Sequence, residues 1–361
     1  MKISNCNIIC LGIIPLLIAC SGRYYTKDDF SKVVKIDSHT HCNSASPGMV
    51  EVAKEDNFRL LYVNVDAPGA ESLKKQFELA SVQHHQFQAR VDFLTAFSLA
   101  NWDSVNWASQ TITKLKADFA AGALGVKVWK NIGMVFKDKS NQFVMIDNPK
   151  FDPVIDFIIQ QDKSVLGHLG EPRNCWLPDE KMTVNSDKEY FKAHPEYHMY
   201  LHPEYPSYED QINARDRFLQ QHPNLRFVGA HLGSLEWSVD ELAKRLDKFP
   251  NMAVDMAERI CHLQFQSRID REKVRNFVIK YQDRLIYGTD FEIDSNRNIA
   301  TAKKHWHDTW LADWKYFVTN ETMTAKQVTG EFKGLQLPRE VVDKIYHKNA
   351  VQWYKINNQD N

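Results

Sequence analysis

Two histidines separated by one residue, His39 and His41, follow a short β-branched run near the start of the chain. Residues two apart on a β-strand point to the same side, so both imidazoles can reach one metal ion. Four later strand-like segments also end in a residue suited to a metal site, and these residues are Lys127, His168, His231 and Asp290. This distribution predicts a metal centre at one end of a parallel barrel.

A metal ion would also explain why such polar residues end apolar strands. A lysine or an unpaired carboxylate is costly to bury inside a barrel. A metal ion offsets that cost because imidazole and carboxylate ligands converge on it. One histidine at a strand end is more often a hydrogen-bonded structural residue, but several His and Asp residues at successive strand ends favour a metal centre.

Strand-like and helix-like segments alternate along most of the chain. Strands are expected at residues 33–39, 59–65, 92–97, 124–129, 164–168, 226–231, 252–256 and 285–290. Helices are expected at residues 49–57, 71–88, 107–121, 153–161, 208–221, 237–249, 270–281 and 298–317. This alternation predicts an α/β fold, a (β/α)8 TIM-like barrel. A doubly wound open sheet is the alternative, and it fits less well because no glycine-rich phosphate loop follows the first strand.

The alternation of side chains along each strand predicts which residues face the barrel interior. In the first strand, Asp37 should point inward with the two histidines, whereas Ile36 should face the helices. In the sixth strand, His231 should lie on the same face as Phe227. The polar side chains would then point inward at the rim where the strands end.

One connection is unusually long for a compact domain. Residues 171–207, after the fifth strand, show no clear periodic element and contain five prolines and many aromatic residues. We interpret this loop insertion as a lid and pocket wall; an ordered insertion beside a neighbouring subunit is the alternative. Glu171 and Arg173 would lie near the metal, where they could bind an anionic substrate or support the ligands. Trp129 and His198 are further candidates for substrate binding.

The N-terminus has the pattern of an export signal. Lys2 precedes an apolar run over residues 8–19 that is too short for a comfortable membrane span. The run ends at Cys20 in a sequence that resembles a bacterial lipobox, which predicts lipidation of Cys20; an ordinary signal peptide is the alternative. The expected organisation is a lipoprotein signal peptide at 1–19, a linker at 20–32 and a barrel at 33–355. The protein would be exported and lipid-anchored to the bacterial cell envelope, in the periplasm or at the outer membrane.

Composition limits the classes of partner. The chain is 43% hydrophobic and 25% charged, with a net charge of −1, which is ordinary for a globular protein. No basic stripe indicates nucleic-acid binding. The expected partner is a small-molecule substrate, the membrane is contacted through the lipid anchor only, and a homo-oligomer is left open.

The ordered motifs resemble the amidohydrolase superfamily, and within it the amidohydrolase-related branch called amidohydrolase family 2. The matching segments are Ile-Asp-Ser-His-Thr-His at 36–41, Gly-Val-Lys-Val-Trp at 125–129, Gly-His-Leu-Gly-Glu-Pro at 167–172, Gly-Ala-His-Leu-Gly at 229–233, Tyr-Gly-Thr-Asp at 287–290 and Lys-Asn-Ala at 348–350. The resemblance spans residues 33–351 and is specific to the superfamily rather than to a substrate.

The resemblance implies a divalent metal cofactor, with zinc as the first expectation. The implied ligands are His39, His41, His168 and Asp290. With one ion, His231 would act as a general acid or base beside the activated water. With two ions, His168 and His231 would bind the second, and a carboxylated Lys127 would bridge the pair; a substrate-binding or structural lysine is the alternative for Lys127.

The implied activity is hydrolysis of a small polar carbonyl compound, such as a lactone, an amide or an ester. Metal-activated water would attack the carbonyl, and the catalytic Asp290 would pass the water's proton to the leaving group. A metal-dependent carboxy-lyase of the same superfamily is the alternative. A third hypothesis is an anchored binding protein that kept the barrel without catalysis.

Overall fold

The computed structural model describes residues 22–67, 69–294 and 298–357. The expected signal peptide at 1–19 and Cys20 lie outside the described residues. Among the residues that are described, no helix combines the length and the apolar character needed to cross a membrane.

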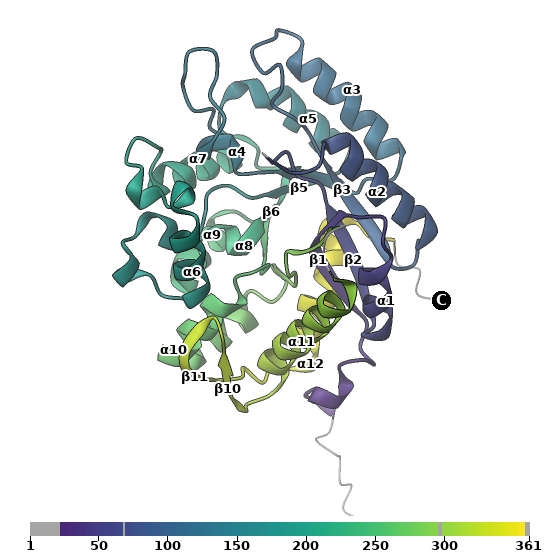
Figure 1. Ribbon diagram of the computed structural model, residues 1–361, viewed down its shortest axis with the longest axis vertical. Coiled ribbons are helices and arrows are strands. Elements are labelled where there is room, and N and C mark those ends of the chain that lie inside the picture. Colours follow the sequence, from purple (N-terminus) through teal and green to yellow (C-terminus); the bar gives the residue numbers. More distant parts are fainter. Residues whose placement is uncertain (1–21, 68, 295–297, 358–361) are drawn as a thin grey trace, which may run out of the picture.

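A curled sheet of parallel strands forms the centre of the molecule (Figure 1). Its strands lie in the order β8-β7-β6-β5-β4-β3-β2-β1-β9. Their bounds are Lys35–Asn43 (β1), Phe58–Val63 (β2), Val91–Ala96 (β3), Gly125–Val128 (β4), Ser164–Gly167 (β5), Arg226–Gly229 (β6), Met252–Asp255 (β7), Leu285–Ile286 (β8) and Phe291–Asp294 (β9). Sequential strands from β1 to β8 are neighbours, as expected for repeated β–α units.

The last two strands belong to one chain segment that joins the two ends of the sheet. β8 pairs with β7, whereas β9 pairs with β1 from Thr40–Phe291 onward. Between them, the Asp290 N–H donates to the His39 carbonyl at 2.7 Å. Residues 285–294 therefore act as the eighth barrel strand, and the predicted (β/α)8 TIM-like barrel is confirmed.

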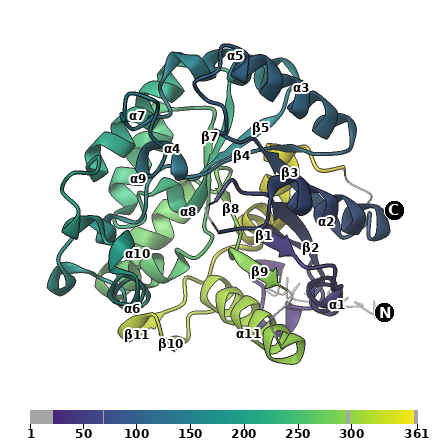
Figure 2. The same cartoon turned by 45° about the horizontal axis from the view of Figure 1, so that its top comes forward.

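Helices surround the strands (Figure 2). The long ones are Gly48–Glu55 (α1), Leu73–Gln86 (α2), Trp107–Ala120 (α3), Asp152–Gln160 (α5), Tyr208–Gln221 (α7), Val239–Lys248 (α9), Ile260–Lys280 (α10) and Ile299–Val318 (α11). Shorter helices are Asn131–Met134 (α4), Ala230–Gly233 (α8), Arg339–Asp343 (α12) and Asn349–Tyr354 (α13). A separate antiparallel pair is formed by the strands Thr322–Ala325 (β10) and Val328–Lys333 (β11). α10 begins at Ile260 rather than at residue 270, and it bends at Asp270, where φ is −149° and ψ is 89°.

One apolar cluster fills the barrel interior. Its strand members are Ile36, Leu61, Val63, Leu94, Leu166, Val228, Ala253 and Ile286. Trp353 and Tyr354 of α13 belong to the same cluster, and the Ser164 hydroxyl donates to the Trp353 carbonyl. α13 therefore closes the end of the barrel opposite the strand ends that carry the predicted metal ligands.

The expected orientation of the first strand was wrong in part. Ile36 lies in the interior cluster, whereas Asp37 points outward and accepts from the Trp310 indole of α11 at 2.9 Å. The pairing of β1 with β2 is irregular between Asp37 and Thr40. This bulge inserts an extra residue and reverses the alternation, so the two histidines that follow face the rim.

The expected orientation of the sixth strand was also wrong. Phe227 packs in the outer core with the helices, and Val228 points into the barrel. β6 ends at Gly229, and His231 has a left-handed backbone with a φ of 59°. A turn after the strand, rather than strand alternation, brings His231 to the rim.

Residues 171–207 are not a bare loop. They contain the helix Asn185–Ala193 (α6) and several 3-10 turns, which the expectation of no periodic element missed. α6 lies on the side of α10 and the β10–β11 pair (Figure 1). Asp187 of α6 accepts from the Asn174 amide at 2.8 Å and lies 3.2 Å from Nε2 of His262 on α10. Buried polar contacts thus hold the insertion to the barrel.

The described part of the expected linker packs on the barrel. Tyr25 donates to Asp343 at 2.8 Å, and Trp314 of α11 donates to the Thr26 carbonyl at 3.0 Å. The Phe30 side chain is buried in the main core. Residues 25–30 are therefore structured rather than free.

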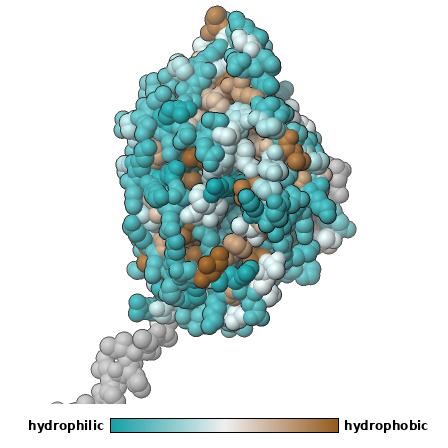
Figure 3. Space-filling model, turned by 90° about the vertical axis from the view of Figure 1, so that its left-hand side faces the viewer, coloured by the Kyte–Doolittle hydropathy of each residue, from teal (hydrophilic) through white to brown (hydrophobic). Residues whose placement is uncertain are grey.

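The side of the molecule that carries α6 and α10 is mostly hydrophilic, with separate hydrophobic spots (Figure 3). Large exposed apolar side chains of the insertion are Tyr190, Tyr197, Tyr200 and Leu201. The homo-oligomer that the sequence left open stays open.

Candidate active site

The predicted ligands of β1 and the β8–β9 segment meet at one rim of the barrel. One carboxylate oxygen of Asp290 lies 3.1 Å from Nε2 of His39 and 3.0 Å from Nε2 of His41. The ligand atoms of these three residues all lie within 4.8 Å of one another. Asp290 and His41 keep partial solvent access, whereas His39 is fully buried.

The remaining predicted histidines join the same group. The His231 ring lies 5.0 Å from the His39 ring and 4.2 Å from the His168 ring, measured between centroids. His39, His231 and Asp255 form a second set whose ligand atoms lie within 4.8 Å of one another. The structure therefore brings together all four histidines, two from β1 and two from the segments that directly follow β5 and β6.

Hydrogen bonds fix the direction of three imidazoles. Nδ1 of His41 donates to the Val63 carbonyl at 2.7 Å, and Nδ1 of His231 donates to the Ala257 carbonyl at 3.0 Å. Nδ1 of His39 donates to Asp255 at 2.8 Å. With Nδ1 protonated and engaged, each ring presents the lone pair of Nε2, which is how metal-binding histidines are held in proteins.

His168 supplies an unsatisfied nitrogen at the same place. Its Nε2 is buried and has no hydrogen-bond partner among the described residues. Buried polar atoms are rarely left in this state, because the lost hydrogen bond costs free energy. Imidazole nitrogens and a carboxylate are the donors that zinc prefers, so the residues present fit a divalent metal.

Burial sets the protonation of these groups. It lowers the pKa of His39, and it lowers the pKa of His168 and His231 well below the ordinary value. Burial opposes ionisation of Asp290, but the positive charge that His39 and His231 carry when protonated outweighs it and holds the pKa of Asp290 well below its usual range. Neutral imidazoles and an ionised carboxylate are the forms that bind metals.

Lys127 faces the interior as predicted, since Val126 and Val128 pack in the outer core. Its Nζ donates to Nε2 of His39 at 3.0 Å, and burial lowers the pKa of Lys127 to about 8. An amine that loses its proton this easily is a better nucleophile than an exposed lysine. Carboxylation of Lys127 stays a prediction.

Strained backbone is concentrated around the group. His231, Glu258 and Asp290 have φ values of 59°, 54° and 68°, in the left-handed region. Side chains other than glycine, asparagine and aspartate rarely adopt this conformation, and it tends to persist at functional sites.

Glu171 lies beside the group, as expected. One oxygen accepts from Lys130, and the other lies 3.7 Å from Nε2 of His168. Trp129 is half-buried, and Lys130 lies over its ring at 5.5 Å. These contacts agree with a supporting role for Glu171 rather than with a free anion-binding residue.

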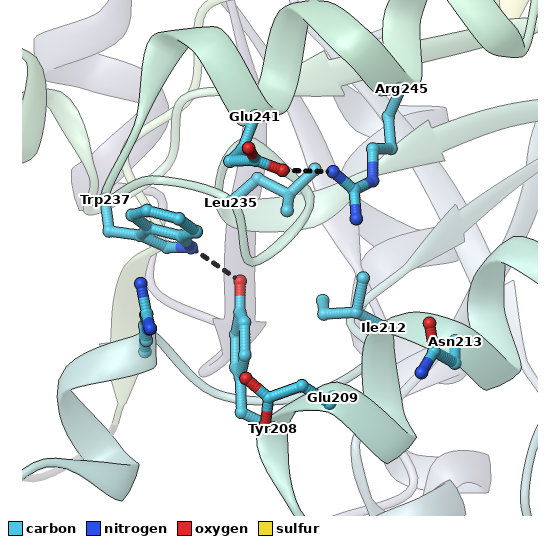
Figure 4. A pocket seen from close by; sticks show the side chains of 9 residues that line it. Tyr208, Glu209, Ile212, Asn213, Leu235, Trp237, Glu241 and Arg245 are labelled. Carbon is cyan, nitrogen blue, oxygen red and sulfur yellow. Dashed lines mark hydrogen bonds and ion pairs between the residues drawn. The ribbon is translucent and has the colours of Figure 1, made fainter.

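Arg173 points away from the group. Its guanidinium lies over the Trp237 ring at 4.1 Å and lines a cavity of about 200 Å³ between α7 and α9. Trp237 donates to the Tyr208 hydroxyl at 2.8 Å in this cavity (Figure 4). The expected contact of Arg173 with a substrate at the metal is not supported by this placement.

His198 is enclosed within the insertion. Its Nε2 donates to the Leu177 carbonyl at 2.8 Å, and its ring stacks on Phe191. It is 4% exposed. These contacts give His198 a structural role in the insertion, and they do not bring it to the metal ligands.

Asp255 is the clearest residue that sequence reasoning left without a role. Asp255 ends the apolar strand β7 in the same way that the predicted ligands end their strands. This position in the sequence could have identified it as a site residue. Its two oxygens accept from Nδ1 of His39 and from the His231 N–H, both at 2.8 Å. It therefore positions two histidines of the candidate metal site.

Comparison with known families agrees with this geometry. Residues 190–356 match the amidohydrolase family model. The amidohydrolase match includes His231 and Asp290, whereas His39, His41 and His168 precede it. No curated protein has a matching sequence.

Solved structures share the barrel. An uncharacterized TIM-barrel protein from Bordetella bronchiseptica superposes with a TM-score of 0.51 at 14% identity, covering 90% of this chain and 99% of that chain. 2,6-Dihydroxybenzoate decarboxylase from Rhizobium superposes with a TM-score of 0.51 at 13% identity, covering 89% of this chain and 98% of that chain. At these identities the likeness establishes the fold.

Proposed function

We propose that this chain is a metal-dependent enzyme of the amidohydrolase type that hydrolyses a small polar carbonyl compound, such as a lactone, an amide or an ester. One observation carries the proposal. Three imidazoles have Nδ1 engaged, while the Nε2 atoms of His39 and His41 both lie next to the Asp290 carboxylate. The amidohydrolase match to residues 190–356 supports the same class.

The residues that would hold the cation are His39, His41, His168 and Asp290. A divalent cation, zinc by preference, would supply Lewis acidity and make water a nucleophile near neutral pH. A second cation would use His168 and His231 with a carboxylated Lys127. In either arrangement the lone pair of Nε2 of His39 would bind a cation. The hydrogen bond from Lys127 to that nitrogen would then be lost, because one lone pair serves one partner.

Two side chains lie where they can take part in the proton transfers of hydrolysis. Asp290 is ionised and partly open to solvent, so its carboxylate can accept the proton of the attacking water. The same oxygen can then deliver that proton to the leaving group. His231 is neutral with Nδ1 engaged, so it offers a lone pair rather than a donor to the substrate.

A carboxy-lyase is the alternative activity. The Rhizobium decarboxylase shares the barrel, and a likeness at 13% identity supports the fold alone. Incubation of the zinc-loaded protein with lactones, amides and aryl carboxylates separates the two activities, because hydrolysis releases acid and decarboxylation releases carbon dioxide. Acid release from a lactone or an amide supports hydrolysis; carbon dioxide release alone would replace it with the lyase.

Metal content tests the proposal that this chain is a metal-dependent enzyme. The protein should bind divalent zinc stoichiometrically after reconstitution. A protein that binds no divalent ion under these conditions would leave only an anchored binding protein.

We also propose that the protein is exported and lipid-anchored to the bacterial cell envelope through Cys20. The apolar run at residues 8–19 and the Leu-Ile-Ala-Cys sequence at 17–20 support this proposal.

A further inference from the structure

The turn that carries His231 has a left-handed backbone over four consecutive residues. His231, Leu232, Gly233 and Ser234 have φ values of 59°, 58°, 62° and 55°. Residues with a side chain avoid this conformation because Cβ comes too close to the following carbonyl oxygen, and it normally occurs at single residues. All but Gly233 have a side chain here. Contacts outside the turn must therefore hold it, and these contacts decide where the His231 ring lies.

Helix α7 presents a buried polar face. Tyr208, Gln211 and Arg215 are spaced by three and four residues, so their side chains lie along one side of the helix. Their exposed fractions are only 6%, 3% and 1%. Burial of a polar group is costly unless that group makes hydrogen bonds. Each of these side chains therefore needs a polar partner within the protein.

Two of these partners are backbone carbonyls of the left-handed turn. The Arg215 guanidinium donates to the Gly233 carbonyl. The Tyr208 hydroxyl donates to the Ser234 carbonyl at 2.5 Å. These carbonyls lie two and three residues after His231. Helix α7 is therefore bonded to the turn at two successive residues.

The same network reaches the segments that follow β4 and β5. The Gln211 amide donates to the Gly133 carbonyl at 2.7 Å, and a Cβ at Gly133 would lie 2.3 Å from the Gln211 amide oxygen. The Ser234 hydroxyl donates to the carbonyl of Gly170, which follows His168 by two residues, at 2.9 Å. The turn is thus tied to the segment that carries a second candidate ligand.

Trp237 fixes the direction of the Tyr208 hydroxyl. The indole N–H donates to the Tyr208 oxygen at 2.8 Å, so the hydroxyl hydrogen serves the Ser234 carbonyl (Figure 4). Loss of the hydroxyl would leave both the indole N–H and that carbonyl without this partner, and unpaired buried polar groups cost free energy. The Tyr208 hydroxyl therefore joins the Trp237 segment to the turn.

We propose that Tyr208 and Arg215 are positioning residues for His231, because they hold the left-handed turn at 231–234 that directs its ring toward the other candidate ligands. The inference rests on the proposed function, which places His231 in the active site. Asp255 accepts from the N–H at the start of the turn, at 2.8 Å, and α7 holds its end. A helix outside the barrel thus acts on the geometry of the site.

The first test removes the hydroxyl from each of two buried tyrosines. Tyr208→Phe deletes the bond to Ser234. Tyr316→Phe is the matched control, because its hydroxyl lies 2.6 Å from that of Ser267, between α10 and α11. Hydrogen exchange of the amides at 232–236 is measured by mass spectrometry on the metal-free proteins. We expect about tenfold faster exchange in Tyr208→Phe and no change in Tyr316→Phe. Equal exchange in Tyr208→Phe and the native protein overturns the inference.

The second readout follows the His231 ring itself. Long-range proton–nitrogen spectra of the histidine side chains report the hydrogen bonding of each ring, and comparison with His231→Asn assigns the His231 signals. In Tyr208→Phe these signals should shift or broaden, whereas those of His222, at the other end of α7, should not. Unchanged His231 signals, or the same change in Tyr316→Phe, overturn the inference even where exchange is faster.

Arg215→Lys tests the second positioning residue. It keeps the charge but removes the planar fork that serves the Gly233 carbonyl and Asp216 together. The His231 signals should shift in this variant too. An unchanged spectrum contradicts the inference even if Tyr208→Phe does not fold.

Both readouts use metal-free protein, so their outcome is separate from that of the proposed function. If the native protein binds no zinc after reconstitution, the proposed function fails whatever the spectra show. If zinc binds and the His231 signals do not respond to Tyr208→Phe, only the role of α7 fails.

Discussion

One carboxylate oxygen of Asp255 lies 2.8 Å from Nδ1 of His39, and both side chains are fully buried. The two residues come from β7 and β1. The other oxygen of Asp255 accepts from the N–H of His231, whose left-handed backbone it helps to hold. Asp255 is therefore a positioning residue for two of the nitrogens that face the candidate metal site.

Asp255→Asn should weaken metal binding without preventing it. The loss of the negative charge makes His39 a weaker ligand and loosens its orientation, and outer-shell changes of this kind typically cost about 10–100-fold in metal affinity. Competition with a chromophoric chelator measures the affinity. Asp152→Asn is the matched control, because Asp152 lies 3.2 Å from Nε2 of His222 away from the site. Equal affinities in the two variants would show that Asp255 does not support the ligands.

His39→Ala should abolish zinc binding rather than merely slow turnover. Among the described residues, His39 belongs to both groups of side chains whose ligand atoms lie within 4.8 Å of one another, so its loss leaves neither group complete. Metal content after reconstitution and dialysis measures the effect. His194→Ala, at an exposed position of the insertion, is the control. Full zinc content in His39→Ala would remove His39 from the ligand set.

The barrel could be predicted from the sequence because each apolar strand is short, regular and followed by a helix. The ligands could be predicted because each ends such a strand. Their orientation could not be predicted from alternation alone. The bulge in β1 puts Ile36 on the same face as His39, and a left-handed turn orients His231. Both depend on pairing with neighbouring strands rather than on local residue type.

The insertion was harder to predict. α6 is short and mostly polar, so it has no clear helical stripe, and its position depends on contacts with residues far away in the sequence. The approach of Asp187 to His262 is such a contact.

Lys35 should make stability depend on pH. It is buried with its Nζ donating to the Val33 carbonyl at 2.7 Å, and burial lowers the pKa of Lys35 from 10.5 to about 7. Between these two values the unfolded chain keeps the proton that the folded chain has released. The free energy of unfolding should therefore rise with pH in this range, by about 1 kcal/mol per pH unit from this group.

Chemical denaturation of Lys35→Met at pH 7.5 and 9.5 tests this expectation. Between these two pH values, the free energy of unfolding of Lys35→Met should rise less than that of the native protein, whatever the absolute stability of the variant. Lys32→Met, at a side chain that is 70% exposed, should keep the increase of the native protein. The same increase in all three proteins would mean that Lys35 titrates normally in the folded state.

Cys20→Ser should release the protein from membranes. Lipidation requires the cysteine thiol, and one hydroxyl in its place cannot carry the lipid. Fractionation of cells that express the full chain measures the distribution, with the native protein as control. An unchanged membrane fraction would refute the lipid anchor.

The segment at residues 285–294 contains a candidate cation ligand and also closes the barrel. Asp290, the carboxylate expected to bind the cation, is also one of the residues whose backbone hydrogen bonds close the sheet into a ring, through its N–H and the His39 carbonyl. Cation binding and closure of the ring of strands therefore meet at Asp290. Hydrogen exchange of the backbone amides of β1 and β9 should slow when the cation is present, which reports loading in the absence of any known substrate.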